Sequence, residues 1–101
     1  MRKFNLKINP FAEEDIIDSY EFYESEKEGL GVEFVQEIKK TIARIEDNPN
    51  QFPKIRNQIR VALANRFPFI IIYYIKGLII NVFAVFHTSR NPKAWRQRIK
   101  K

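Results

Sequence analysis

The stretch from Phe67 to Phe86 most strongly limits what this chain of 101 residues can form. It is rich in β-branched and aromatic residues, and it is long enough to resemble a membrane span. Pro68, the pair Lys76-Gly77 and Asn81 interrupt it. Two strands joined by a tight turn at Lys76-Gly77 explain this pattern better than a transmembrane helix. The stretch therefore predicts a buried β-hairpin and no membrane partner.

The turn also predicts which side chains share a face of the hairpin. If Lys76 and Gly77 are its central residues, Ile75 pairs with Leu78. One face is then almost wholly apolar, and we expect helices to cover it. Its predicted members are Phe67, Phe69, Ile71, Tyr73 and Ile75 on one strand, and Leu78, Ile80, Val82, Ala84 and Phe86 on the other.

The second face of this hairpin is mixed in character. In the same register it places Arg66 opposite His87 near one end. Arg60 is expected to project to the same side from the neighbouring strand, because Ile59, Val61 and Leu63 alternate with it. These positions predict a half-open basic groove that contains His87.

Two helices are expected before the hairpin. After a short strand from Phe4 to Ile8, Asn9-Pro10 supplies a capping side chain and a proline at the first helical position, which predicts a helix to about Lys27. The glycines of the segment Gly29 to Gly31 should end it. A second helix is predicted from about Val32 to Asp47, with an apolar stripe of Phe34, Ile38, Ile42 and Ile45.

The remaining segments complete one small domain. Residues Asn50 to Asn57 read as a loop, and Asn91-Pro92 begins a short basic tail with one or two helical turns. The expected fold class is α+β. An N-terminal strand and an antiparallel helical hairpin pack on one face of a small, mainly antiparallel sheet, within a single domain that covers residues 1–101.

Charge is distributed unevenly along the chain. Residues 1–50 hold 7 basic residues against all 12 acidic ones, which gives −5, whereas residues 51–101 hold 11 basic residues and no acidic one, which gives +11. A half without carboxylates favours a surface for a polyanion, either nucleic acid or an acidic protein segment. The alternative is that the two halves fold together and their charges cancel.

Composition excludes several classes of protein. The chain has no cysteine and one histidine, so disulfides and the usual zinc sites are excluded. Its three glycines, at positions 29, 31 and 77, form no phosphate-binding loop. We therefore expect no metal and no cofactor. Because the N-terminal segment carries no apolar signal core, we expect the protein in the cytoplasm.

His87 is the one residue that could carry acid–base chemistry here. RNA cleavage without a metal needs a proton acceptor, a proton donor and cations on the phosphate, and a histidine among arginines can supply them. Taken alone, a histidine that merely ends a strand is the simpler interpretation. Tyr73 and Tyr74 are better explained as packing residues than as catalytic ones.

The basic tail presents a similar choice. Trp95 is flanked by Lys93, Arg96 and Arg98, so it could stack on a base while the cations follow the phosphates. We favour the other interpretation, in which Trp95 anchors the tail on the sheet.

The order of these elements resembles the RelE/ParE superfamily of bacterial toxins, and three motifs add to the resemblance. The segment Asn48-Pro49 to Phe52-Pro53 is similar to the turn after the family's second helix. Arg60 followed by Arg66-Phe67-Pro68-Phe69 resembles its arginine and arginine-(Phe)-Pro-Tyr strand start. The ending His87-Thr88-Ser89-Arg90-Asn91-Pro92, with Trp95 three residues on, resembles that of ParE-like plasmid-stabilisation toxins.

The resemblance implies the toxin of a type II toxin–antitoxin system, neutralised by a cognate antitoxin. ParE-like members inhibit DNA gyrase and arrest growth, whereas RelE-like members cut mRNA on the ribosome. By position, Arg60 matches a phosphate-binding arginine of the nucleases, and His87 and Arg90 lie where some of them keep catalytic groups. The ParE-like ending, and a tail without a clear tyrosine, favour gyrase as the target.

Two alternatives remain open at this point. One is a ribosome-dependent, metal-independent endoribonuclease, and the other is a basic nucleic-acid-binding module without toxicity. The oligomeric state is left open. The predicted target- or nucleic-acid-binding residues are the same for each of these functions: Arg66, Tyr74, Lys93, Trp95, Arg96 and Arg98.

Overall fold

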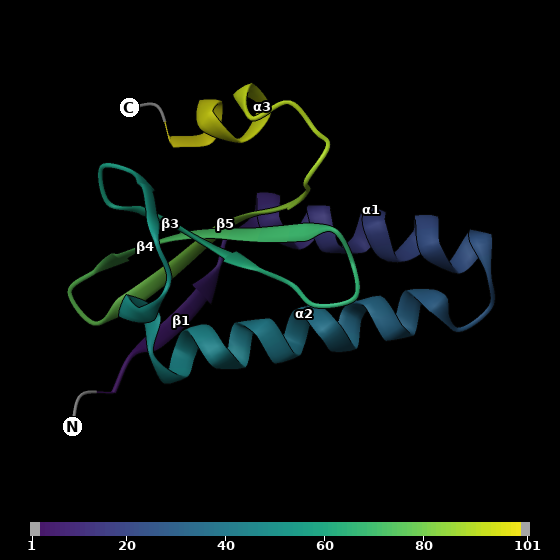
Figure 1. Ribbon diagram of the computed structural model, residues 1–101, viewed down its shortest axis with the longest axis horizontal. Helices are drawn as coiled ribbons and strands as arrows, with labels where there is room; N and C mark the ends of the chain where they lie inside the picture. Colours follow the sequence, from purple (N-terminus) through teal and green to yellow (C-terminus); the bar gives the residue numbers. More distant parts are fainter. Residues whose placement is uncertain (1–2, 100–101) are drawn as a thin grey trace.

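A five-stranded sheet and a helical hairpin form the two layers of the computed structural model, which describes residues 3–99 (Figure 1). The expected α+β class, with the hairpin on one face of the sheet, is confirmed. In chain order the elements are β1 (Asn5–Ile8), α1 (Pro10–Glu26), α2 (Leu30–Asp47), the 3-10 turn η1 (Pro49–Gln51), β2 (Lys54–Arg56), β3 (Ile59–Leu63), β4 (Phe69–Lys76), β5 (Ile79–His87), α3 (Lys93–Arg96) and the 3-10 turn η2 (Gln97–Ile99).

The strands lie in the order β1-β5-β4-β3-β2. Neighbouring strands from β2 to β5 are antiparallel, and β1 alone pairs in parallel, along β5. The Asn9 N–H extends this parallel pairing by donating to the Val82 carbonyl oxygen at 2.8 Å. The chain then enters α1, and the Asn9 side chain accepts a hydrogen bond from the Phe11 N–H at 2.7 Å, which confirms the predicted cap.

The turn between the two helices differs from the prediction. Helix α2 begins at Leu30, so Gly31 lies inside the helix and does not interrupt it. Gly29 takes a left-handed φ of 88° just before the helix. A Cβ at position 31 would lie 2.6 Å from the Tyr20 carbonyl oxygen, so Gly31 allows α1 and α2 to approach closely. The Glu24 carboxylate accepts from the N–H groups of Gly29 and Gly31, at 2.8 and 2.9 Å, and caps α2.

The predicted loop from Asn50 to Asn57 is also partly wrong. It contains η1 and the short edge strand β2, which pairs with β3 across an irregular register. Asn57 turns the chain between them with a positive φ of 49°. Three exposed residues carry too little apolar pattern to predict a strand, so this element depends on its pairing partner.

The hairpin register corrects the predicted pairing. Lys76 pairs with Ile79, so Gly77, at φ 61°, and Leu78 occupy the turn, and Ile75 pairs with Ile80 instead of Leu78. This shift of two residues keeps every side chain on its predicted face.

A β-bulge further along β5 does change the faces. Tyr73 pairs with Val82, but Ile72 pairs with Ala84, so Phe83 is an extra residue in β5. Beyond it, alternate residues exchange sides. Ala84 and Phe86 lie on the face away from the helices, contrary to the prediction, and Val85 lies under the helices.

Two clusters of buried residues follow from this arrangement. The larger lies between the sheet and the helices, and includes Phe34, Ile38, Ile45, Ile71 and Tyr73. The smaller lies on the opposite face of the sheet, beneath the tail formed by α3 and η2, and consists of Ile59, Ile72, Phe83, Ala84, Phe86 and Trp95. Within residues 3–99, no helix combines the length and apolar character that a membrane crossing needs.

Candidate functional site

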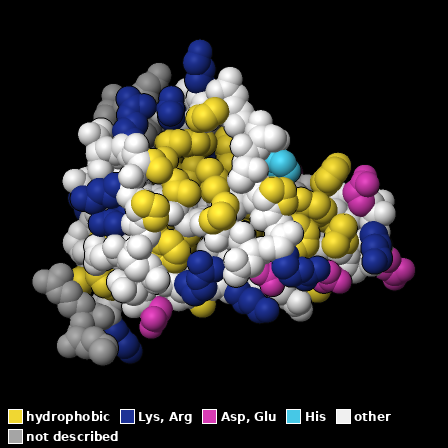
Figure 2. Space-filling view, viewed as in Figure 1, with side chains coloured by type: hydrophobic (Ala, Val, Ile, Leu, Met, Phe, Trp, Pro, Cys, Tyr) yellow, Lys and Arg dark blue, Asp and Glu magenta, His cyan; other side chains and the backbone are white. Residues whose placement is uncertain are grey.

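The face of the sheet that α1 and α2 leave uncovered, called here the open face, is the first candidate surface. Figure 2 shows hydrophobic side chains gathered over the sheet, with Lys and Arg side chains around them. Val61 and Ile70 are half-buried members of this surface and Leu63 is exposed. An apolar centre with a basic margin can bind a partner that carries both apolar groups and negative charge.

The C-terminal tail covers one part of the open face. Trp95 is only 4% exposed, and its ring lies 6.1 Å from that of Phe83. This position confirms the interpretation of Trp95 as an anchor for the tail. The Arg96 guanidinium lies over the outer side of the Trp95 ring at 5.6 Å, and Arg96 and Lys93 are exposed.

Arg98 has a structural partner that the sequence interpretation missed. Its guanidinium forms two charge-assisted hydrogen bonds with the Asp15 carboxylate on α1, at 2.7 and 3.0 Å, and a third with the Phe83 carbonyl oxygen at 2.9 Å. Asp15 also accepts from the Val85 N–H at 2.9 Å. Arg98 therefore fastens the tail to α1 and β5, and is a poor candidate for a residue that binds nucleic acid.

Arg60 also bonds within the protein. Its Nη1 donates to the carbonyl oxygens of Phe52 and Asn50, at 2.5 and 3.2 Å, across the segment that joins η1 to β2. Arg60 pairs with Tyr73, four residues along β4 from Phe69, so it projects to the helix-covered side of the sheet and not, as predicted, to the open face. These contacts indicate that Arg60 holds the turn after α2, the segment that resembles the family motif.

Arg66 precedes β4 in a turn and has a positive φ of 69°. Its Nη2 forms an exposed ion pair with Glu33 of α2 at 2.7 Å. The hydrogen bond from Arg66, with its charge, lowers the pKa of the Glu33 carboxyl below its ordinary value. Arg66 is therefore directed towards the helices.

His87 lies on the helix-covered side of the sheet. Its ring is 5.3 Å from that of Phe69, and it lines an open hollow of about 290 Å³ with residues of α1. His87 Nδ1 accepts from the Ser89 N–H at 3.1 Å and lies 2.8 Å from the Ser89 hydroxyl oxygen. The predicted position of His87 in a groove on the open face is wrong, because the bulge at Phe83 reverses the alternation of β5. The other residues lining this hollow are Asp18, Ser19, Phe22, Tyr23 and Phe69.

The three candidate catalytic residues therefore do not form one site. The partners of Arg60 and His87 on β4, Tyr73 and Phe69, are four residues apart, which corresponds to about 13 Å along a strand. Arg90 lies over the Phe86 ring at 3.9 Å. Their roles in catalysis remain predictions, but the predicted basic groove of Arg60, Arg66 and His87 is not formed by the described residues. Nor do residues 3–99 place three His, Asp or Glu side chains together as metal ligands.

Tyr74, another predicted binding residue, lies on the open face. It is half-buried, and its ring lies 6.0 Å from that of Phe83.

Asp15, by contrast, was not singled out from the sequence. The available signal was its place on α1, three residues after the buried Ala12 and next to Ile16, at the border of the apolar face.

Comparison with known proteins agrees with this fold. Ten chains of solved structures match. One, from a structure described as the chromosomal ParDE TA system from P. aeruginosa, has a TM-score of 0.78 and 21% identity, and the match covers 86% of this chain and 98% of that chain. Among curated proteins, none matches.

A family model described as the ParE toxin of the type II toxin–antitoxin system parDE matches residues 6–92. The matched range includes α1 and α2, all strands except the first residue of β1, and the His87-to-Pro92 ending. The resemblance expected from the sequence is thereby confirmed. The chain belongs to the family of ParE toxins of type II toxin–antitoxin systems.

Proposed function

We propose that this protein arrests growth by inhibiting DNA gyrase and that a cognate antitoxin keeps it inactive in the cytoplasm. The observation that carries this proposal is the family match over residues 6–92. The separation of Arg60, His87 and Arg90 supports it further, because an inhibitor that works by binding needs no assembled catalytic groups.

The open face supports the antitoxin part of the proposal. Its centre is apolar, residues 51–101 contain no acidic residue, and β4 and the tail carry the exposed cations Lys76, Lys93 and Arg96. An antitoxin segment that alternates apolar and acidic side chains would satisfy both features. Such a segment would cover part of the open face and neutralise charge around it.

The first test is pulse-labelling of bacteria after tightly controlled induction of the protein. We expect thymidine incorporation to fall within minutes, before methionine incorporation, and co-expression of the neighbouring antitoxin gene to prevent both. An earlier fall in methionine incorporation would favour the RelE-like ribonuclease instead. Should neither fall while folded protein is present, growth arrest itself would be contradicted.

A second assay separates binding from catalysis. Purified protein should inhibit supercoiling by DNA gyrase, and His87→Ala should inhibit equally well, because His87 lines a hollow beside α1 and has no assembled partners for cleavage. Loss of a catalytic acid or base would reduce activity by about 10²-fold or more. A loss of that size in His87→Ala, with the fold intact, would contradict inhibition by binding alone.

A further inference from the structure

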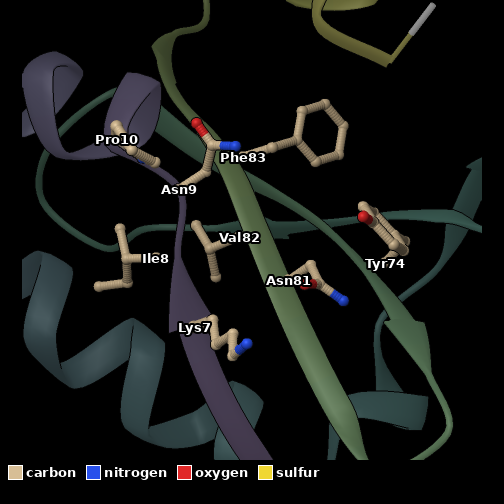
Figure 3. A pocket seen from close by; sticks show the side chains of 8 residues that line it. All are labelled: Lys7, Ile8, Asn9, Pro10, Tyr74, Asn81, Val82 and Phe83. Atoms are coloured by element: carbon tan, nitrogen blue, oxygen red, sulfur yellow. The ribbon is translucent and has the colours of Figure 1, made fainter. Parts of the chain in front are cut away.

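A second hollow lies on the open face at the end away from His87. It has a volume of about 220 Å³, and Figure 3 shows its lining side chains. It is smaller than the ~300–1,000 Å³ of pockets that take drug-sized ligands, so it can hold one planar base but cannot bury a larger compound. None of the lining residues is acidic. They are Lys7, Ile8, Asn9, Pro10, Tyr74, Asn81, Val82 and Phe83.

Three of these residues come together because of the sheet register. Lys7 of β1 pairs with Asn81 of β5, and Asn81 pairs with Tyr74 of β4. Paired residues in adjacent strands project to the same face, and neighbouring strands lie ~4.8 Å apart. An amine, an amide and a phenol ring therefore stand in a row across three strands, as the sticks in Figure 3 show.

The amide of Asn81 is available to a ligand. Among the described residues, its Nδ2 donates one long bond of 3.4 Å, to the Ile79 carbonyl oxygen of the same strand. Asn81 is half-buried, as is Tyr74, and Lys7 is exposed. The side-chain amide of asparagine offers one donor and one acceptor side by side, which is the pattern that reads the edge of a nucleobase.

The ring of Tyr74 is supported by a buried aromatic neighbour. It packs at 6.0 Å and 51° against Phe83, which is almost fully buried in the cluster beneath the tail. A partly exposed aromatic ring on a sheet, beside basic side chains, is a common means of stacking the bases of single-stranded nucleic acids. Lys76, the last residue of β4, adds a second exposed cation two residues from Tyr74.

We propose that this hollow, called here the β1 hollow, binds one nucleotide of a single-stranded nucleic acid. The base stacks on Tyr74, its polar edge bonds to the Asn81 amide, and the phosphate lies at Lys7. An acidic peptide would account for Lys7 but would leave the ring and the donor–acceptor pair of Asn81 without a specific role. The proposal does not depend on gyrase as the target, because it concerns binding by the isolated protein.

The test measures fluorescence anisotropy of a labelled single strand of DNA, the same strand as RNA, and the DNA duplex, each titrated with the full chain. We expect both single strands to bind more tightly than the duplex. A preference between DNA and RNA would identify the natural strand. Tighter binding of the duplex would overturn the proposal.

Substitutions separate stacking from attraction by charge. Tyr74→Leu should weaken binding about 5- to 150-fold, which corresponds to the ~1–3 kcal/mol that stacking contributes for each base, whereas Tyr74→Phe, which keeps the ring, should bind nearly as the wild type does. Lys7→Gln should lower the slope of log affinity against log salt by about 0.7. Lys39 is an exposed residue of α2, so Lys39→Gln is the matched control for loss of one charge. It should change the affinity and the salt dependence little.

Two results would show only unspecific attraction between a basic protein and a polyanion. One is equal weakening by Lys39→Gln and Lys7→Gln, and the other is equal affinity of Tyr74→Leu and Tyr74→Phe. A measurement on the unaltered protein guards against misfolded variants. In a nitrogen-15 NMR titration, the Asn81 side-chain amide signals should shift with the unlabelled strand, and unchanged Asn81 signals at saturation would overturn the proposal.

Discussion

The two faces of the sheet are covered in different ways. On one side, α1 and α2 contribute 17 and 18 residues of regular helix, and Phe34, Ile38 and Ile45 are fully buried against the strands. On the open face the cover is a short tail, residues 93–99, anchored by Trp95 and Arg98. The first cover is continuous and apolar, whereas the described contacts of the second centre on the Trp95 ring and the Arg98–Asp15 ion pair.

Stability and binding are therefore assigned to different faces of the sheet. The helix side contains close aromatic contacts, with Phe34 4.8 Å from Phe69 and 5.5 Å from Phe67. The open face keeps exposed or half-buried apolar groups beside its tail. A partner that binds the open face can therefore cover new surface without disturbing the principal core.

The largest expected effect tests the helix side. Phe34→Ala removes a fully buried ring from the centre of the aromatic contacts, and should lower the free energy of unfolding by about 3–5 kcal/mol. Urea denaturation followed by circular dichroism measures this change. Phe22→Ala is the matched control on α1, because Phe22 is 58% exposed, and it should cost at most about 0.5 kcal/mol. Similar losses in both variants would break the distinction between core and surface.

The next effect tests how the tail is held. Asp15→Asn and Arg98→Gln each disrupt the buried pair, and a double-mutant cycle should give a coupling energy of about 1–3 kcal/mol. We expect less than the usual cost of breaking a buried ion pair, because the Arg98 side chain is partly exposed and can turn into water when Asp15 is replaced by a neutral residue.

Proteolysis shows whether that coupling belongs to the tail. In both single variants, trypsin should cleave the chain at Lys93 and Arg96 faster than in the wild type, while the rest of the protein stays folded. Arg98→Lys keeps the charge but not the two-pronged geometry, so its tail should be protected only in part. If the changes in unfolding free energy of the two single variants simply add up to that of the double variant, the ion pair does not hold the tail.

The same contrast explains what could be predicted from the sequence. The amphipathic helices, the Asn9 cap and the hairpin are local patterns, so their residues indicate them directly. The bulge at Phe83 is not local, because it depends on how β4 and β5 fit across the sheet. One extra residue moved His87 off the open face. Arg60, which pairs with the helix-covered Tyr73, and Arg66, which pairs with Glu33, are absent from that face for other reasons, so the predicted groove is not formed.

The tail illustrates a second limit. Its composition predicted a basic segment with a tryptophan anchor, and the burial of Trp95 in the cluster on the open face confirms that prediction. Arg98 was indistinguishable from its basic neighbours, because its partner Asp15 is 83 residues away and lies among several acidic residues of α1. Long-range ion pairs leave almost no periodic signal in one sequence.

The smallest of these effects compares the two sides at neighbouring residues, Tyr73 under the helices and Tyr74 on the open face. The buried Tyr73 hydroxyl donates to the Pro49 carbonyl oxygen at 2.6 Å, and Tyr73→Phe should cost about 1 kcal/mol of unfolding free energy at pH 7. Burial raises the pKa of Tyr73 to about 12. The folded state then keeps this proton where the unfolded state loses it, so the stabilisation is complete below about pH 10 and declines towards pH 12.

Urea denaturation of the wild type and Tyr73→Phe between pH 7 and pH 12 tests this point. Because the phenylalanine variant lacks the titrating group, the stability advantage of the wild type should shrink above pH 10 and disappear near about pH 11. A constant difference across this range would mean that the Tyr73 hydroxyl is reached by water in the folded protein. The Tyr73 hydroxyl on the helix-covered side would then be as accessible to solvent as Tyr74 on the open face.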